Sequence, residues 1–474
     1  MWLRPSCPVA MNISKRVVSA VFILIALYML RADWLLYTTQ CAHIGEDFWE
    51  YYTAAWLVRG NQSLDLYEAA GKDVDPAEED PAPNSIFEQT AQAHGVLFTH
   101  PYDYPPTFAD LLLPITLMRP NAALISWYLL NAAALVWAGL LLVRVPGTHL
   151  SAYAAPVIVF LCIFPATADC LIYAQIPIIL LLLVIAGIDL YARGKTLGAA
   201  SLFALAAAIK LTPFVVLIPL LAWRDWKTLR AMALWCLAIL AALMAVNGWG
   251  SLDLYFLHEM PKVATKWIDP GNRSLDTLVE ALWSRSTTGA PMPGSVFAGR
   301  FLSALVLCCA GWLSWIKRTE TLEIAGRIET IAIFLLLSCC VAPLSWPHAY
   351  VLSAPALVIV GQRTWERRLP FPEAAVALLF LLSMSIVRLQ TQGWLTAPLG
   401  ITLAVMGLLR LRRERRSHLP GLSEGGSSCL RNQSSKRQSQ RPQEFLTDLA
   451  PKDPRIAPRP RRMASTVAHF SSGM

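Results

Sequence analysis

Long apolar runs alternate with short polar segments along most of this chain. The runs lie near residues 17–37, 121–143, 152–168, 171–192, 196–209, 211–223, 228–247, 298–316, 328–344, 346–362, 371–388 and 394–410. A helix that crosses the hydrocarbon core of a bilayer needs about 20 residues. Because the runs are continuous rather than alternating, they favour helices over the strands of a barrel. The pattern predicts an all-α polytopic membrane protein with about twelve transmembrane helices.

The composition supports this interpretation. Of the 474 residues, 55% are hydrophobic and 15% are charged, and the mean hydropathy is +0.46. A soluble domain carries about 25% charged residues, so the composition argues against a water-soluble fold. The ten cysteines include no pair with the spacing of a zinc site, and we expect neither a metal nor a cofactor.

Positive charge determines the predicted orientation. Lys and Arg gather in short segments between alternate runs, whereas two long segments, at about 38–105 and 248–297, together hold six of them. Cytoplasmic loops of membrane proteins carry an excess of Lys and Arg. We therefore expect a protein of the cell membrane with both termini in the cytoplasm and these two segments as outer loops.

The end of the chain differs from the rest. Residues 411–474 are rich in Ser, Arg and Pro and nearly lack aromatic residues, so they cannot bury enough surface to fold alone. Their basic start can hold anionic lipid headgroups, but without a fold it is poor evidence for nucleic-acid binding, and we expect no nucleic-acid partner. The predicted organisation is a transmembrane domain over residues 1–410, in contact with the bilayer, and a disordered cytoplasmic tail.

The first outer loop is acidic, with twelve Asp and Glu against two basic residues. Residues 47–60 have helical character, and Tyr51 and Tyr52 belong to an aromatic face that suits an interfacial helix. Asp47 lies at the start of this helix, where a helix cap is the common role of an aspartate and a catalytic carboxylate is the alternative. A short apolar run at 106–118 is expected to be interfacial or re-entrant.

Ionisable residues are nearly absent from the interiors of the predicted spans. The polar residues at the predicted outer ends include Asp47, Asp169, Lys210, Asn272 and His348. Helix ends that meet on one face can form a pocket open to both lipid and water, which suits a lipid-linked substrate. A transporter or flippase of lipid-linked saccharide would instead need coupling residues at mid-depth. A membrane enzyme is therefore the leading interpretation, and a catalytically silent scaffold is a third.

Short motifs follow one another in the order of a known family. They are Asp47-Phe48-(x)2-Tyr51-Tyr52-x-Ala54-Ala55, Gly60, Leu66-Tyr67, Tyr104-Pro105-Pro106, Ala174-Gln175-Ile176-Pro177, Ile209-Lys210-Leu211-Thr212-Pro213, Gly271-Asn272-Arg273-Ser274-Leu275 and Ala342-Pro343-Leu344-Ser345-Trp346-Pro347-His348-Ala349-Tyr350. This series resembles the polyprenyl-phosphate-mannose-dependent glycosyltransferases of family 87, membrane enzymes with the GT-C architecture. The resemblance runs from about residue 17 to 410. The family's Gly-Gln-x-Asn and Gly-Asn-Gln-Ser-Leu segments differ here at Pro177, in place of Asn, and at Arg273, in place of Gln.

The resemblance implies roles for individual residues. In such enzymes a polyprenyl phosphate carries the donor sugar, here expected to be mannose, and transfer to a glycan or glycolipid acceptor inverts the anomeric centre outside the cytoplasm. Asp47 is implied to be the general base, which must reach the attacking hydroxyl, and Glu46 is the nearest alternative for this role. Lys210 and His348 are suited to stabilise the departing phosphate. The remaining candidates for substrate binding are Gln175, Asn272, Tyr51 and Tyr52.

Overall fold

The computed structural model describes most of the chain up to Arg416. The described residues are 23–31, 33–38, 44–71, 85–96, 99–146, 148, 150–264, 271–284, 293–316, 323–366, 371–385 and 395–416. Within these ranges every regular element is a helix and there is no strand. Residues 411–416, the start of the predicted disordered tail, instead belong to a helix that begins at Thr396. The rest of the tail lies outside the described residues, and its disorder stays a prediction.

Helices form where the apolar runs predict them. In the predicted spans they are α5 (Pro120–Leu142), α6 (Ala154–Ile163), α7 (Pro165–Ile172), α8 (Pro177–Ala192), α9 (Thr196–Ile209), η5 (Thr212–Val216), α10 (Leu217–Ala222), α11 (Trp226–Asp253), α14 (Pro293–Ile316), α15 (Ile324–Val341), η8 (Pro347–Ser353), α16 (Ala354–Trp365), α17 (Phe371–Ser385) and α18 (Thr396–Arg416). The first predicted outer loop and the short run after it form α2 (Phe48–Arg59), η2 (Ser63–Gly71), α3 (Ile86–Ala93), α4 (Pro106–Leu111) and η3 (Leu113–Leu117). The second predicted loop contains η6 (Leu254–Glu259), α12 (Met260–Ala264) and α13 (Leu275–Ser284).

Four of the described helices are long and apolar enough to cross a membrane. They are Pro120–Leu142, Trp226–Val263, Gly294–Ile316 and Ile324–Val341, and the pair Leu150–Ile163 and Pro165–Ile172, bent by 49°, adds a fifth if it forms one span. Prolines at 165, 177 and 213 lie in the first turn of a new helix and so divide longer apolar runs. The polytopic, all-helical class is confirmed for the described residues. The count of about twelve spans and the GT-C arrangement stay predictions.

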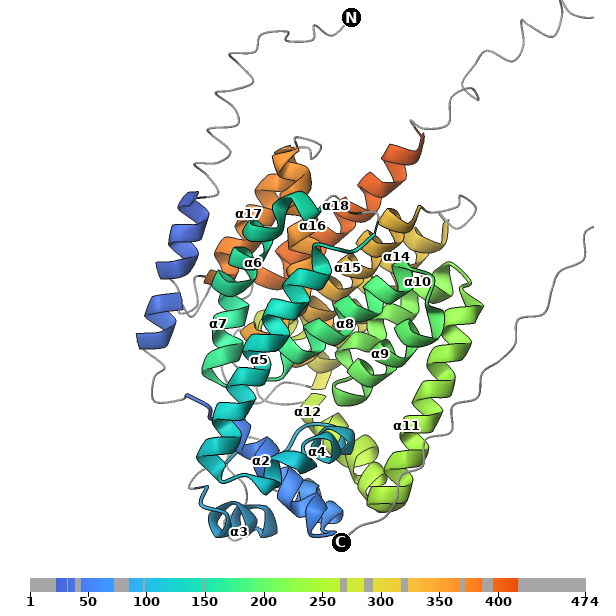
Figure 1. Cartoon of the computed structure of the whole chain (residues 1–474). Helices are drawn as coiled ribbons and strands as arrows, with labels where there is room; N and C mark the ends of the chain where they lie inside the picture. Colours follow the sequence, from blue (N-terminus) through green and yellow to red (C-terminus); the bar gives the residue numbers. More distant parts are fainter. Residues whose placement is uncertain are drawn as a thin grey trace, which may run out of the picture. The chain divides into compact units, whose positions relative to one another are not determined.

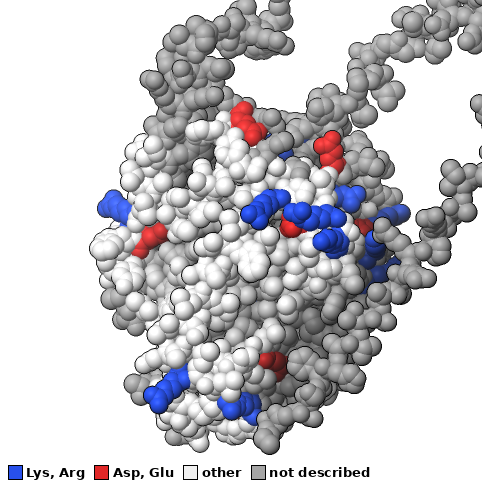
Figure 2. Space-filling model, viewed as in Figure 1, with Lys and Arg blue, Asp and Glu red and all other residues white. Residues whose placement is uncertain are grey.

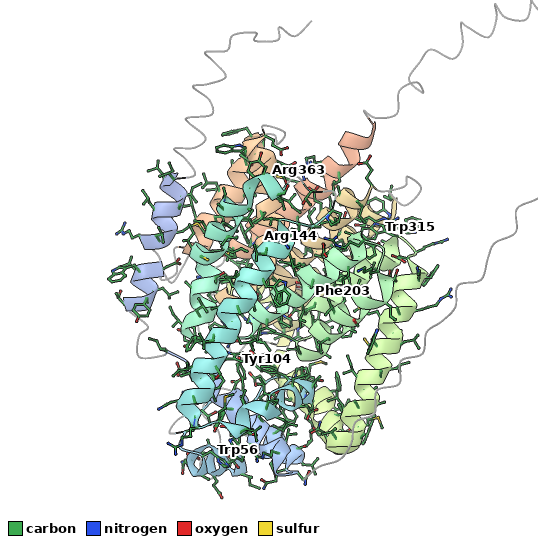
Figure 3. The ribbon with its side chains drawn as sticks, viewed as in Figure 1. Trp56, Tyr104, Arg144, Phe203, Trp315 and Arg363 are labelled. Atoms are coloured by element: carbon green, nitrogen blue, oxygen red, sulfur yellow. The ribbon has the colours of Figure 1, made fainter. Side chains whose placement is uncertain are left out.

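The two ends of the helix bundle differ in the helices that form them and in their charge. Figure 1 shows α2, α3 and α4 gathered at its lower end, which α5 and α11 reach, with α16 and α17 at the upper end. Trp56 and Tyr104 lie toward the lower end, whereas Arg144 and Arg363 lie toward the upper end (Figure 3). In Figure 2, Lys and Arg gather across the upper part of the visible face, and a broad zone below them carries almost no charge. Such a zone suits contact with lipid.

α2 is largely buried inside the protein. It packs against α3, α4, α5 and the two short helices η2 and η3, and most of its residues are inaccessible to solvent. The ring of Tyr51 lies 4.9 Å from that of Phe108 and 6.1 Å from that of Trp127, measured between centroids. Such aromatic contacts bury large areas and anchor a helix firmly. The predicted helix is confirmed, but the aromatic face expected at the membrane interface is covered by protein.

The turn after α7 has a conformation that glycine usually supplies. Ala174 has a φ of 57°, the N–H of Gln175 donates to the carbonyl of Cys170 at 2.8 Å, and the N–H of Ala174 donates to that of Leu171 at 3.3 Å. These bonds form a Schellman motif, in which a left-handed residue satisfies the last carbonyls of the helix. Ala174 occupies the position of Gly in the Gly-Gln-x-Asn pattern. The turn therefore directs Gln175 at a cost in backbone strain of about 1–2 kcal/mol.

Buried ion pairs join the last four helices. Arg410 of α18 pairs with Glu329 of α15 and, at 2.6 Å, with Glu373 of α17, while Arg363 of α16 also pairs with Glu329. The side chains of Arg410, Glu329 and Glu373 are almost fully buried. Charges so far from water are stable only when they are paired. This network therefore determines how α15, α16, α17 and α18 pack together.

Gly187 allows α8 and α9 to pack closely, and this contact can be tested. A Cβ at position 187 would lie 2.6 Å from Cε1 of Phe203. We expect Gly187→Ala to lower the free energy of unfolding by about 1–3 kcal/mol, as overpacking does, and to lower the Tm in detergent. The matched control is Gly361→Ala in α16, because no side chain lies within 4 Å of that Cβ. Equal stability of the two variants would contradict the packing.

The strained turn at Ala174 gives a second prediction. Ala174→Val should reduce the free energy of unfolding by about 1–3 kcal/mol, because a branched Cβ is poorly tolerated at positive φ. Ala174→Gly relieves the strain but increases the entropy of the unfolded chain by about 0.4–1 kcal/mol, so its net effect should be small. Thermal unfolding in detergent measures both changes. A valine variant as stable as the glycine variant would show that the turn carries no strain.

Candidate active site

Two backbone hydrogen bonds fasten the start of α2 to the end of α7. The N–H of Gly45 donates to the carbonyl of Ile172 at 2.8 Å, and the N–H of Asp47 donates to that of Tyr173 at 3.2 Å. The last carbonyls of a helix lack partners within it, so the end of α7 offers free acceptors. The bonds bring Asp47 beside the turn that carries Gln175.

The side-chain amide of Gln175 connects Asp47 to two tyrosines. Its Nε2 donates to Oδ2 of Asp47, and its Oε1 accepts from the hydroxyls of Tyr51 and Tyr104, each at 2.9 Å. A carboxylate can only accept, so the NH₂ side of the amide must face Asp47. The tyrosine hydroxyls then hold the amide in that orientation. The network fixes the direction of the Asp47 carboxylate.

The side chain of Asp47 does not cap α2. Asp47 occupies the N-cap position, but it makes no capping hydrogen bond, so the helix-cap alternative is wrong for its side chain. Burial raises the pKa of Asp47, while the charge of His348 and the hydrogen bond from Gln175 oppose that rise. A carboxylate with a raised pKa is a stronger base than an exposed aspartate. This environment suits the abstraction of a proton from a hydroxyl group.

Lys210 reaches the same group of residues from the end of α9. It directly follows Ile209, the last residue of that helix, and its Nζ lies 5.1 Å from the ring centroid of Tyr104. An ammonium over an aromatic face is stabilised by a cation–π interaction. The charges of Glu50, Asp103 and Asp47 also act on Lys210. The site therefore contains a cation that is held in place by protein groups.

His348 approaches from η8, in a distant part of the sequence. Its Nδ1 lies 3.2 Å from Oδ2 of Asp169 in α7, and the two side chains are 8% and 6% exposed. The charge of His348 also acts on Asp47. The imidazole is therefore bonded to one carboxylate and lies within electrostatic reach of a second.

Tyr52 and Asn272 have structural contacts instead. The hydroxyl of Tyr52 donates to the carbonyl of Met118 at 2.9 Å. The amide of Asn272 donates to the carbonyl of Pro343 at 2.9 Å and accepts from the N–H of Ser345 at 3.0 Å. Asn272 thus ties the segment before α13 to the segment before η8, which carries His348. Of the predicted candidates, the structure brings Gln175, Tyr51, Lys210 and His348 around Asp47.

Three further residues belong to the surroundings of the site. Glu50 lies three residues after Asp47 on α2, a spacing that places both on one helix face, and it is 6% exposed. Tyr104 belongs to the Tyr-Pro-Pro motif. The motif marks this residue in the sequence but does not indicate which groups its hydroxyl contacts. Asp169 stands out in the sequence only as a polar residue at a predicted helix end. Among the described residues, no group of three His, Cys, Asp or Glu could hold a metal ion.

Pro177 and Arg273, which also depart from the family pattern, fit their positions. Pro177 lies in the first turn of α8, where a helix does not need the N–H that proline lacks. Arg273 is 2% exposed, and its guanidinium donates to the carbonyl of Met384 at 3.1 Å. Neither residue disturbs the hydrogen bonds of Gln175 or Asn272.

Comparisons with known proteins agree with this geometry. The model of glycosyltransferase family 87 matches residues 102–343, just over half of the chain. The chain is also similar, with 26% identity over 307 residues, to a polyprenol-phosphate-mannose-dependent alpha-(1-2)-phosphatidylinositol mannoside mannosyltransferase of Mycobacterium tuberculosis, covering 61% of this chain and 67% of that protein. No solved structure matches. The matched region contains Gln175 and Lys210, which the structure places around Asp47, and the chain belongs to glycosyltransferase family 87, as a membrane glycosyltransferase.

Proposed function

We propose that this protein transfers mannose from a polyprenyl phosphate to a hydroxyl group of an extracytoplasmic glycan or glycolipid, with inversion of the anomeric carbon. The name of the mycobacterial relative specifies a polyprenol-phosphate-mannose donor and a phosphatidylinositol mannoside acceptor. The observation that carries the proposal is the half-buried carboxylate of Asp47, oriented by Gln175 beside Lys210 and His348. This is the set of groups that an inverting transfer from a phosphate ester requires.

The reaction assigns a role to each group. Asp47 accepts the proton of the acceptor hydroxyl while the hydroxyl oxygen forms a bond to C1 of the sugar. The bond between C1 and the phosphate oxygen breaks, and polyprenyl phosphate leaves with that electron pair. A general base must lie within about 2.6–3.2 Å of the hydroxyl. Lys210 and His348 stabilise the negative charge that grows on the phosphate.

The distribution of charge supports an extracytoplasmic site. Tyr104, which contacts both Gln175 and Lys210, lies toward the end of the bundle opposite Arg144 and Arg363 (Figure 3). Lys and Arg gather on the half of the visible face that is remote from α2 (Figure 2). By the positive-inside rule the basic end faces the cytoplasm. The proposal therefore places the site outside the cell membrane and both termini inside.

A flippase of lipid-linked saccharide is the alternative function. It would move the donor across the membrane without forming a glycosidic bond, and it would need ionisable coupling groups near the middle of the bilayer. The described site instead combines an oriented carboxylate with Lys210 and His348 at one end of the bundle. This combination favours transfer over transport.

Replacement of Asp47 tests the proposed base. Asp47→Asn preserves the size of the side chain but cannot accept a proton, so transfer from radiolabelled polyprenyl-phosphate mannose in reconstituted vesicles should fall by about 10²–10⁴-fold. The control is Glu46→Gln, the same change at the neighbouring residue, which pairs with His100 at 3.2 Å and should keep most activity. Undiminished transfer by Asp47→Asn would refute the role of Asp47 as the general base. Movement of donor across vesicles without a new glycosidic bond would favour the flippase.

The pH dependence of transfer gives an independent prediction. Asp47 works as a base only when it is ionised, and burial raises its pKa above the ordinary value of 3.8. The acid limb of kcat/KM should therefore lie above pH 3.8, with activity lost as the pH falls through the raised pKa. The charge of Glu46 contributes to that rise, so Glu46→Gln should move the limb to lower pH. A pH–rate profile in which the limb stays in place or moves upward would contradict the assignment.

A further inference from the structure

His348 is held by a carboxylate that the proposed mechanism does not use. Its Nδ1 lies 3.2 Å from Oδ2 of Asp169, and α7, which carries Asp169, packs directly against η8. Among the residues that the structure describes, the ring makes no other hydrogen bond. An imidazole has two nitrogens, so Nε2 is the one left for a substrate. The contact with Asp169 therefore decides which edge of the ring can meet the phosphate.

A buried arginine also interacts with Asp169 through its charge. Arg273 is 2% exposed, and the negative charge of Asp169 acts on its guanidinium. A nearby cation favours the ionised form of a carboxylate. An ionised carboxylate at Nδ1 fixes the orientation and tautomer of an imidazole and stabilises the imidazolium. Arg273 and His348 thus both interact with Asp169, Arg273 through its charge and His348 through a hydrogen bond.

We infer that Asp169 is a positioning residue, which holds His348 so that Nε2–H donates a hydrogen bond to the departing phosphate. The inference rests on the proposed function. As the bond between C1 and oxygen breaks, the phosphate oxygen gains negative charge, and the imidazolium stabilises it while keeping its proton. Asp47 accepts the acceptor's proton in the same step, so every proton is accounted for. Asp169 itself touches no substrate and acts through the ring.

A double-mutant cycle separates this role from a general structural one. Asp169→Asn keeps the shape of the side chain but removes its charge, and we expect kcat for mannose transfer to fall by about 10–100-fold, as loss of a supporting carboxylate does. KM for the acceptor should change little. In a His348→Gln background the same replacement should have almost no effect, because the ring through which Asp169 acts is absent. Additive losses, or no loss in either background, would overturn the inference.

Two further variants keep the test decisive. Asp189→Asn is the matched control, because Asp189 is also buried and paired with an arginine, Arg193 at 2.8 Å, near the far end of α8, and kcat should stay at the parent value. If Asp169→Asn does not fold, Asp169→Glu takes its place. The fall in kcat that Asp169→Glu causes must likewise disappear in the His348→Gln background. A parent protein that transfers no mannose refutes the proposed function. A parent that transfers mannose while the cycle is additive refutes only the role of Asp169.

Discussion

The site depends first on backbone hydrogen bonds between the end of α7 and the start of α2. The final carbonyls of α7 have no partners within that helix, and an unpaired buried carbonyl is costly. The N–H groups of Gly45 and Asp47 satisfy them, which holds the start of α2 against α7. The aromatic cluster around Tyr51 then keeps α2 from rotating. Asp47 faces Gln175 because the backbone leaves its side chain little alternative.

Compensation of charge is the second constraint on this site. The two candidate phosphate-binding groups, Lys210 and His348, are both accompanied by carboxylates, from Glu50 and Asp103 for the lysine and from Asp169 for the histidine. Buried cations without such partners would lose their charge or destabilise the fold. Asp169 contacts His348 directly, so this partner holds the imidazole in place before a substrate arrives. Preorganised charge of this kind needs no rearrangement during the reaction.

The sequence predicts the local structure well because lipid and protein cores impose the same requirement on the backbone. The run at 196–209 coincides with α9, and the order of the motifs correctly indicates that Gln175, Lys210 and His348 meet near Asp47. The amphipathic pattern of α2 could not reveal whether protein or lipid covers its aromatic face, since both are apolar. Prolines within apolar runs were visible, but the 49° bend between α6 and α7 depends on packing.

Partners that are distant in the sequence could not be predicted from one chain. The contact of Asp169 with His348 joins positions 179 residues apart, and neither residue carries a local signal for the other. The same is true of Asn272, whose predicted role was substrate binding and whose contacts in the structure are with the backbone near Ser345. Spacing within one helix could have indicated Glu50, because it follows Asp47 by three residues.

The ion pairs of the last four helices also bear on how the protein enters the membrane. Arg410 is synthesised 81 residues after Glu329 and 37 residues after Glu373, so both carboxylates emerge from the ribosome before this arginine, whereas Arg363 follows Glu329 by only 34 residues. Each carboxylate would cost several kcal/mol if it entered the bilayer interior unpaired and ionised. The network that joins these helices can therefore be completed only after α18 has been made. α18 thus joins α15 and α17, two helices made before it, through a single arginine.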